Sequence, residues 1–305
     1  MPFFIRLLFT VLAAASIPFI LERPARAADT SAAREAIESF PRFTVETIGT
    51  KGPDVILIPG LATPREVWWP LAQALKGEAR LHLVELRGFA PGDPGPNAQG
   101  GVIVGLVDGL AAYIADHKLK HAKVIGHSLG GLAALKLAER KPAGLDGVMI
   151  VDAMPFIGTL FAGPTATVAM IEPQAVALRD QLLGLAKSGG AMPPATNNAL
   201  TEAGKAKIVE WTRAVDLSVV AWALHEDMVT DARPGLAALA VPLTLLYPVS
   251  GSEADQARTR ALYTGAYADV RGARLVGIER SAHFIMLDQP ALFEKEVRVF
   301  LLSGR

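Results

Sequence analysis

The stretch "KVIGHSLGGLAAL", residues 123–135, places a serine between glycines where a strand-like apolar run changes into a helix-forming segment. Residues 126–130 follow the pattern G-x-S-x-G. Between a strand and a helix, this pattern holds the serine on a tight, strained turn that exposes its hydroxyl at the edge of a sheet. The flanking glycines lack Cβ atoms, so neighbouring elements can approach the turn closely. Ser128 is therefore a candidate nucleophile; the alternative is that it only caps the following helix.

Strand-like and helical patterns alternate on both sides of this motif. Apolar runs that end at turn residues predict strands, with an edge strand first, at 42–49, 54–60, 80–88, 122–126, 147–153, 241–249 and 273–278. Helical patterns predict helices at 64–77, 102–119, 128–142, 255–268 and 290–302. Strands that alternate with helices of this length are typical of a mostly parallel, doubly wound α/β sheet flanked by helices.

The alternation is interrupted between about Met154 and Asp231, where no strand pattern occurs. Two helical stretches there are separated by "SGGAMPPAT", a run of turn-forming residues. We therefore expect an α/β core made of residues 28–153 and 232–305. Residues 154–231 are expected to form a helical cap between two neighbouring strands. The alternative is that these helices belong to the core.

The first residues are typical of a secretory leader rather than of the folded domain. An apolar run from Leu7 to Leu21 follows Arg6, and the small residues Ala25 and Ala27 then flank Arg26, as at a signal-peptidase site. Residues 1–27 are thus predicted to be a cleaved signal peptide, and the mature protein is expected to be exported, periplasmic or secreted, with no stable membrane span. The alternative is an N-terminal membrane anchor, although the run is short for one.

Composition excludes several classes of function. The 305 residues contain 30 Lys and Arg against 30 Asp and Glu, so no basic field is available to bind nucleic acid. Cysteine is absent, which excludes disulfides, thiolate catalysis and cysteine-bound zinc. No metal cluster, phosphate loop or dinucleotide fingerprint is found, so neither a cofactor nor a metal is expected.

A serine nucleophile needs a base, and the chain has six histidines. His283 lies in "SAHFIMLDQP", after the last expected strand, and loops at that end of a parallel sheet meet at the edge that carries Ser128. The others are less well placed, in a strand, near a helix end, beside the serine or in the expected cap: His82, His117, His121, His127 and His225. An oxyanion hole is also needed, and the backbone N–H groups of Leu129 and Leu61 are the candidate donors.

With these motifs, residues 40–303 resemble the α/β-hydrolase fold family in its capped branch. The resemblance rests on "IGHSLGG", "IPGLATPREVWWPLA", "LRGFAPG" and "SAHFIMLDQP". Pro59 stands where the family commonly has histidine, which removes a side chain but leaves the backbone amide. The resemblance implies an esterase-like serine hydrolase that cleaves a carboxylic ester or related acyl bond with Ser128, His283 and an acid.

The acid is where the chain departs from the family pattern. Gly251 falls at the position where the family usually has aspartate, after the strand that follows the cap. Glu253 and Asp255 come slightly later and are also suited to capping a helix. Asp152, at the end of the preceding strand, is our first candidate because a carboxylate there can reach the same imidazole.

The expected substrate is a small molecule with an apolar acyl or aromatic part, because apolar side chains gather at the start of the expected cap. These side chains are Met154, Phe156, Phe161 and Met170, and the alternative is that they belong to the core. Three activities on the same constellation stay open: acyl transfer, carbon–carbon bond hydrolysis and cofactor-free haloperoxidation. A catalytically inactive binding module is the alternative from a different class.

Overall fold

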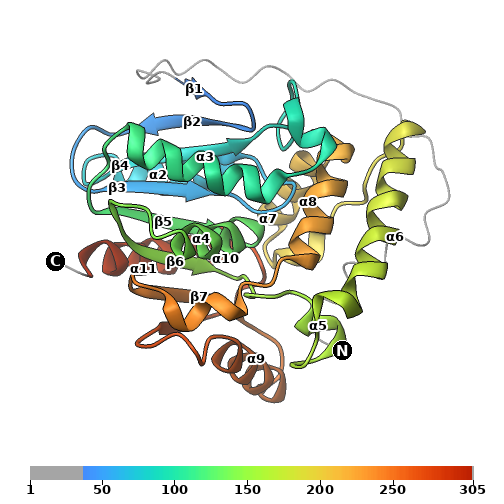
Figure 1. Cartoon of the computed structure of the whole chain (residues 1–305). Coiled ribbons are helices and arrows are strands. Elements are labelled where there is room, and N and C mark those ends of the chain that lie inside the picture. Colours follow the sequence, from blue (N-terminus) through green and yellow to red (C-terminus); the bar gives the residue numbers. More distant parts are fainter. Residues whose placement is uncertain (1–36, 304–305) are drawn as a thin grey trace.

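A computed structural model describes residues 37–303, so the expected signal peptide lies outside the described residues. It contains one twisted sheet between two layers of helices (Figure 1). The strands are β1 (Ile37–Ser39), β2 (Phe43–Ile48), β3 (Asp54–Ile58), β4 (Arg80–Leu86), β5 (Ala122–His127), β6 (Leu145–Val151), β7 (Leu243–Val249) and β8 (Arg274–Glu279). Their order is β1-β2-β4-β3-β5-β6-β7-β8, with β1 and β2 antiparallel and the remaining strands parallel.

The expectation that β2 forms an edge of the sheet was wrong. The three-residue strand β1 pairs with it through Ile37, Glu38 and Ser39 and takes the outer position. A strand this short offers no periodic pattern in the sequence, and Ile37 is half exposed. The central strands β3 and β5 are buried throughout, which explains their unbroken apolar runs.

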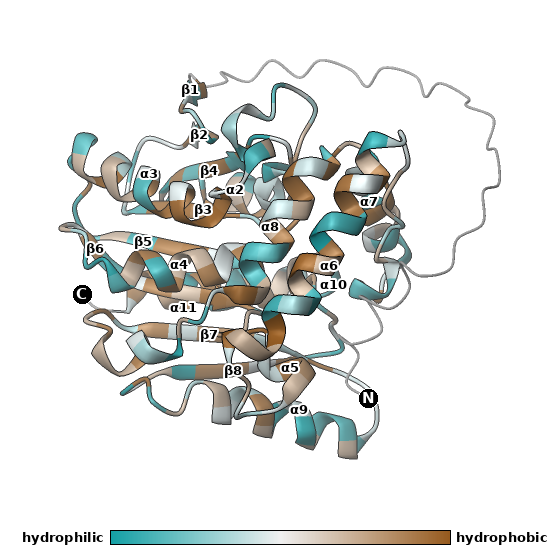
Figure 2. Cartoon of the chain, turned by 45° about the vertical axis from the view of Figure 1, so that its right-hand side comes forward, coloured by the Kyte–Doolittle hydropathy of each residue, from teal (hydrophilic) through white to brown (hydrophobic). Residues whose placement is uncertain are grey.

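Helices cover both faces because successive strand residues point to opposite sides of the sheet. Ile56 and Val124 pack beneath α3 (Val102–Asp116) and α4 (Leu129–Glu139), and α9 (Glu253–Ala266) covers the same face. Leu57 and Ile125 point to the other face, beneath α2 (Trp69–Leu75) and α11 (Pro290–Leu302). Figure 2 shows the strands of the sheet largely in brown, the colour of hydrophobic residues.

Between β6 and β7 the described chain contains helices and no strand, as expected. These elements are α5 (Thr159–Ala162), α6 (Val168–Lys187), α7 (Glu202–Thr212) and α8 (Leu217–Val229), with short 3₁₀ turns η4 (Thr196–Asn198) and η5 (Arg233–Ala238). Figure 1 shows α6, α7 and α8 beyond the carboxyl ends of the parallel strands. Helices α6 and α8 pack against each other, and Phe156, Ile171 and Met228 form a small apolar cluster at their base. Over residues 37–303, no helix is both long and apolar enough to cross a bilayer.

Candidate active site

Ser128 occupies a strained turn between β5 and α4. Its φ is 54° and its ψ is −123°, a conformation that non-glycine residues rarely adopt. The turn is possible because of close backbone packing: a Cβ at Gly126 would collide with the Gly130 carbonyl, and one at Gly130 would collide with the Ile58 carbonyl. The G-x-S-x-G pattern thus has a mechanical cause here, and it leaves Ser128 half-buried at the end of its strand.

His283 and Asp152 are brought together from separate strands. His283 lies in the loop between β8 and α10 (Ile285–Asp288), and its Nδ1 is 2.6 Å from Oδ2 of Asp152. Asp152 directly follows β6 and, like Ser128, has a positive φ, of 46°. Tyr263 of α9 donates its hydroxyl to the other carboxylate oxygen. Burial and the neighbouring Asp152 raise the pKa of Tyr263 well above its usual value, so this hydroxyl stays a donor.

Glu253 and Asp255, the alternative acids, lie elsewhere. Asp255 accepts the backbone N–H of Ser252 at 3.1 Å, and its own N–H donates to the Ser252 hydroxyl at 3.3 Å. This reciprocal pair is a capping box at the start of α9. Glu253 is exposed in the same turn. The two acids therefore belong to the helix start, and the structure brings Asp152 to His283 instead.

His127 supports the neighbouring histidine from beneath. It is completely buried, does not line the cavity described below, and its Nε2 lies 3.0 Å from the backbone carbonyl of His283. Burial holds the pKa of His127 well below its usual value, and the nearby His283 lowers it further. His127 is therefore neutral, and its Nε2–H donates to that carbonyl. No local pattern in the sequence predicts this contact, because it joins positions far apart in the chain.

The remaining histidines are engaged elsewhere. His82 contacts Asp54 and Tyr113 at 2.9 and 2.8 Å, His117 contacts Glu38 at 2.9 Å, His121 lies 3.7 Å from Asp146, and His225 lies 3.2 Å from Glu172. Across the described part of the chain, no three His, Asp or Glu side chains gather as metal ligands.

The two expected oxyanion donors lie on either side of the serine. Leu129 is the first residue of α4, so its N–H belongs to the first turn, where backbone donors have no intrahelical partner. Leu61 follows β3 and lines the same cavity as Ser128. A Cβ at Gly60 would lie 2.9 Å from His127 Nδ1 and 3.0 Å from Ser128 Cβ, so a glycine at this position keeps the loop close to the turn.

A cavity of about 420 Å³ contains both Ser128 and His283 on its walls. The rest of its lining is mainly apolar and includes Leu178, Leu182, Met192, Trp211 and Phe284. None of the four apolar side chains considered at the start of the cap lines this cavity, which agrees with the alternative that such residues belong to the core. Phe156 and Phe161 pack in the cluster at the base of α6 and α8, Met170 is exposed, and Met154 lines a smaller cavity of about 20 Å³ beside Ser128. The apolar wall comes instead from later turns of α6 and from α7, whose inward faces the sequence pattern did not distinguish.

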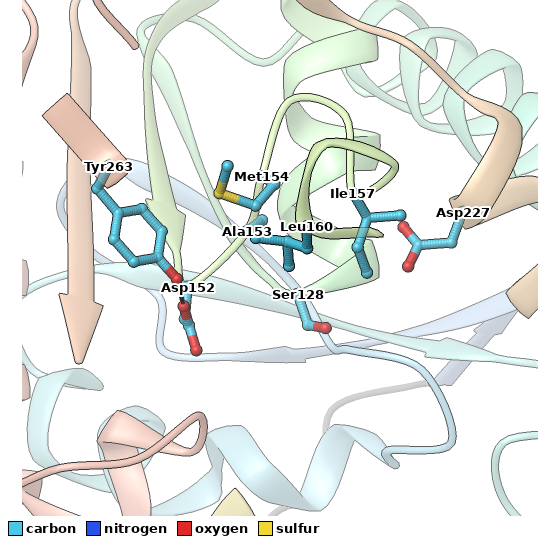
Figure 3. Close-up of a pocket in the computed structure, with 8 residues that line it drawn as sticks. All are labelled: Ser128, Asp152, Ala153, Met154, Ile157, Leu160, Asp227 and Tyr263. Atoms are coloured by element: carbon cyan, nitrogen blue, oxygen red, sulfur yellow. Dashed lines mark hydrogen bonds between the residues drawn. The ribbon is translucent and has the colours of Figure 1, made fainter. Parts of the chain in front are cut away.

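Sequence reasoning also missed a second buried carboxylate. Asp227 of α8 is 8% exposed and lines both cavities with Ser128. Figure 3 shows its carboxylate reaching toward the serine from the side opposite Asp152. Burial raises the pKa of Asp227 to about 7, although the nearby His283 acts in the opposite direction. No sequence pattern distinguishes a helical aspartate that faces a cavity from one that faces solvent.

We expect Asp227→Asn to stabilise the fold above neutral pH. The folded protein retains a proton on Asp227 that the unfolded chain, with its ordinary pKa of 3.8, releases, so wild-type stability falls as pH rises from about 4 to about 7. The variant lacks this loss. Its free energy of unfolding should therefore exceed that of the wild type by up to about 4 kcal/mol at about pH 8, and by less at about pH 5. Urea unfolding at both pH values measures the difference. Glu85, whose pKa burial also raises to about 7, is present in both proteins and cancels. An equal gain at both pH values would contradict the prediction.

The model of the "Alpha/beta hydrolase family" matches residues 55–296, most of the chain. The protein therefore belongs to the alpha/beta hydrolase family. The enol-lactonase from Burkholderia xenovorans has a similar structure, with a TM-score of 0.63 and 20% identity over 86% of this chain and 96% of that one. This likeness shows the shared fold.

Curated relatives match over a shorter stretch. Pimeloyl-[acyl-carrier protein] methyl ester esterase from Aeromonas salmonicida is 36% identical over 112 residues, which is 37% of this chain and 42% of the relative. The same enzyme from Nitrosomonas europaea is 32% identical over 111 residues, 36% of this chain and 41% of the relative. The chain thus spans about two fifths of the length of these relatives.

Proposed function

We propose that this protein is a serine hydrolase that cleaves a carboxylic ester or a related acyl bond. One observation carries the proposal: the imidazole of His283 is held by Asp152 at 2.6 Å and lines the same cavity as the strained Ser128. A nucleophile, a base and an orienting acid are the three groups that acyl transfer through a serine needs.

The geometry indicates a role for each group. Asp152 accepts the Nδ1–H of His283, which leaves Nε2 as the basic nitrogen. Nε2 takes the proton of the Ser128 hydroxyl as its oxygen attacks the substrate carbonyl, and the imidazolium that forms is stabilised by Asp152. The N–H groups of Leu61 and Leu129 stabilise the oxyanion. The proton then passes to the leaving group, and an acyl-serine forms. Water, deprotonated by the same imidazole, releases the acid and restores Ser128.

The cavity supports a small substrate with an apolar acyl or aromatic part. Its walls are mainly apolar, and it holds about 420 Å³ beside the serine. Residues 154–231 act as the cap in this proposal, because α6 and α7 supply much of that wall. The two curated relatives described above are methyl ester esterases, which is consistent with an ester substrate. Analysis of the products distinguishes hydrolysis from transfer to another acceptor.

A fluorophosphonate probe tests whether the serine is activated. We expect covalent labelling at Ser128 and turnover of short- to medium-chain p-nitrophenyl esters, because the probe reacts with serines that have a working base. Peptide mass spectrometry locates the label, and Ser128→Ala supplies the background. A folded protein that is not labelled and turns over no ester above that background would instead be a binding module.

We also propose that residues 1–27 are removed during export. The sequence pattern supports this proposal: an apolar run followed by small residues at positions 25 and 27. Expression in a Gram-negative host, with fractionation and N-terminal sequencing, should find a periplasmic chain that begins at Ala28. A chain that retains its first residues in the membrane fraction would indicate an anchor.

A further inference from the structure

Asp227 differs from the other buried carboxylates of the described chain in having neither a hydrogen bond nor an ion pair. The others all have a hydrogen bond or an ion pair: Glu46 lies 3.8 Å from Arg65, Glu85 accepts from Arg65, Asp54 contacts Arg80 and His82, Asp152 contacts His283 and Tyr263, and Asp288 accepts three backbone N–H groups. Over residues 37–303, no donor is found for the Asp227 carboxylate. A buried polar group without a partner is costly, and such a group commonly has a functional reason.

The neighbouring residue shows that this is not a property of the helix. Glu226, the residue before Asp227, accepts the backbone N–H groups of Val102 and Ile103 at 3.0 and 2.7 Å. It thereby caps the N-terminus of α3 on the far side of α8. Asp227, one residue further along the helix, points in a different direction, into the space that contains Ser128 (Figure 3). The unpartnered oxygens are therefore presented to whatever occupies the cavity.

The charges around Asp227 restrict what that occupant is. His283 is the only side chain lining the large cavity that can carry positive charge, and no Lys or Arg of the described residues lines it. On the smaller cavity the titratable neighbours are Asp152 and Tyr263, and these bind each other. His225 of α8 and Glu172 of α6 contact each other at 3.2 Å and line neither cavity. An anionic substrate group would thus meet a carboxylate and no fixed cation.

We propose that Asp227 is a substrate-binding residue that accepts a hydrogen bond from an ammonium, hydroxyl or amide donor on the substrate. This inference rests on the proposed function of the Ser128 site and names its substrate class. The preferred substrates are apolar esters that carry such a donor, and esters with a free carboxylate at the same position are rejected. Binding of the donor supplies the partner that the folded protein lacks.

Matched end groups test this proposal. Methyl esters of increasing acyl length are prepared with a methyl, an ammonium or a carboxylate end, and kcat/KM is measured for each at about pH 8, above the pKa of Asp227, so that its carboxylate is ionised. At the chain length that reaches Asp227, the wild type should prefer the ammonium end over the methyl end by roughly 10- to 100-fold, the range of a charge-assisted hydrogen bond. The carboxylate end should be the poorest substrate. Asp227→Asn should reduce the ammonium preference to about threefold or less.

The control is Asp180→Asn. Asp180 lies on α6 outside the cavity, is largely exposed and pairs with Arg179, so its replacement changes the net charge equally. The end-group ratio should be unaltered in this variant. A preference for the carboxylate end in the wild type, or the same ratio in Asp227→Asn as in the wild type, would overturn the proposal.

A binding measurement separates this inference from the proposed function. Alkylammonium and alkylcarboxylate ions of matched length are titrated calorimetrically into the wild type and Asp227→Asn, which needs no turnover. Tighter binding of alkylammonium to the wild type alone supports the role of Asp227 even if no ester is cleaved. Equal binding of both ions overturns it, even if Ser128 is labelled by the fluorophosphonate probe.

Discussion

Replacing Ser128 by alanine is expected to lower kcat for a p-nitrophenyl ester by roughly 10⁵- to 10⁶-fold, the loss that removal of a serine nucleophile causes in other triads. The variant retains the cavity and the backbone donors, but it cannot form the acyl-serine. The residual rate comes from binding and oxyanion stabilisation alone. Burst-phase kinetics should show stoichiometric release of the first product in the wild type and no burst in the variant.

The control for this experiment is a test of whether Ser128→Ala folds like the wild type. Ser128 has a positive φ, and alanine at such a position is strained as well. Circular dichroism and the unfolding midpoint therefore have to match those of the wild type within a small difference. A well-folded Ser128→Ala protein that keeps more than about a tenth of the wild-type kcat would exclude Ser128 as the nucleophile.

Asp152→Asn is expected to lower kcat by roughly 10³- to 10⁴-fold, with a smaller change in KM. The asparagine keeps the size of the side chain and can still accept from Tyr263. Its NH₂ group, however, faces Nδ1 of His283, which then has to be unprotonated, so Nε2 carries the proton and cannot act as a base. Steady-state kinetics over a pH series measures the loss.

Asp255→Asn is the matched control. It removes one carboxylate of the same type from the start of α9 and weakens the capping box with Ser252. Its expected effect is a small loss in the free energy of unfolding, with kcat close to that of the wild type. The reverse result, in which Asp255→Asn is inactive and Asp152→Asn is active, would move the acid to the loop after β7.

The sequence predicts the central fold well because its signals are local. Buried parallel strands require unbroken apolar runs, and the turn at Ser128 requires glycines where backbones touch, so both leave direct traces in the chain. Strand β1 left no trace, since three residues are too few for a pattern. The position of Asp227 was missed for a different reason: a helical aspartate reads as solvent-facing until the packing of α8 shows where it points.

The choice among the acids illustrates a further limit. Asp152 and Asp255 both follow strands in the sequence. Which one meets His283 depends on side-chain direction after two distant segments dock, a property that no local pattern contains. The two candidate acids follow neighbouring strands of the sheet: Asp152 follows β6, and Asp255 follows β7.

The place of Asp152 has a consequence for how this scaffold can change. With Ser128 after β5 and Asp152 after β6, two of the three groups that the proposed chemistry uses follow adjacent, directly paired strands, which fixes their separation rigidly. In this proposal the turn between β7 and α9 supplies no catalytic group, and its residues form the start of α9. Insertions or grafted peptides at Gly251 should therefore be tolerated with activity retained. The turn is thus a site for engineering close to the proposed catalytic residues.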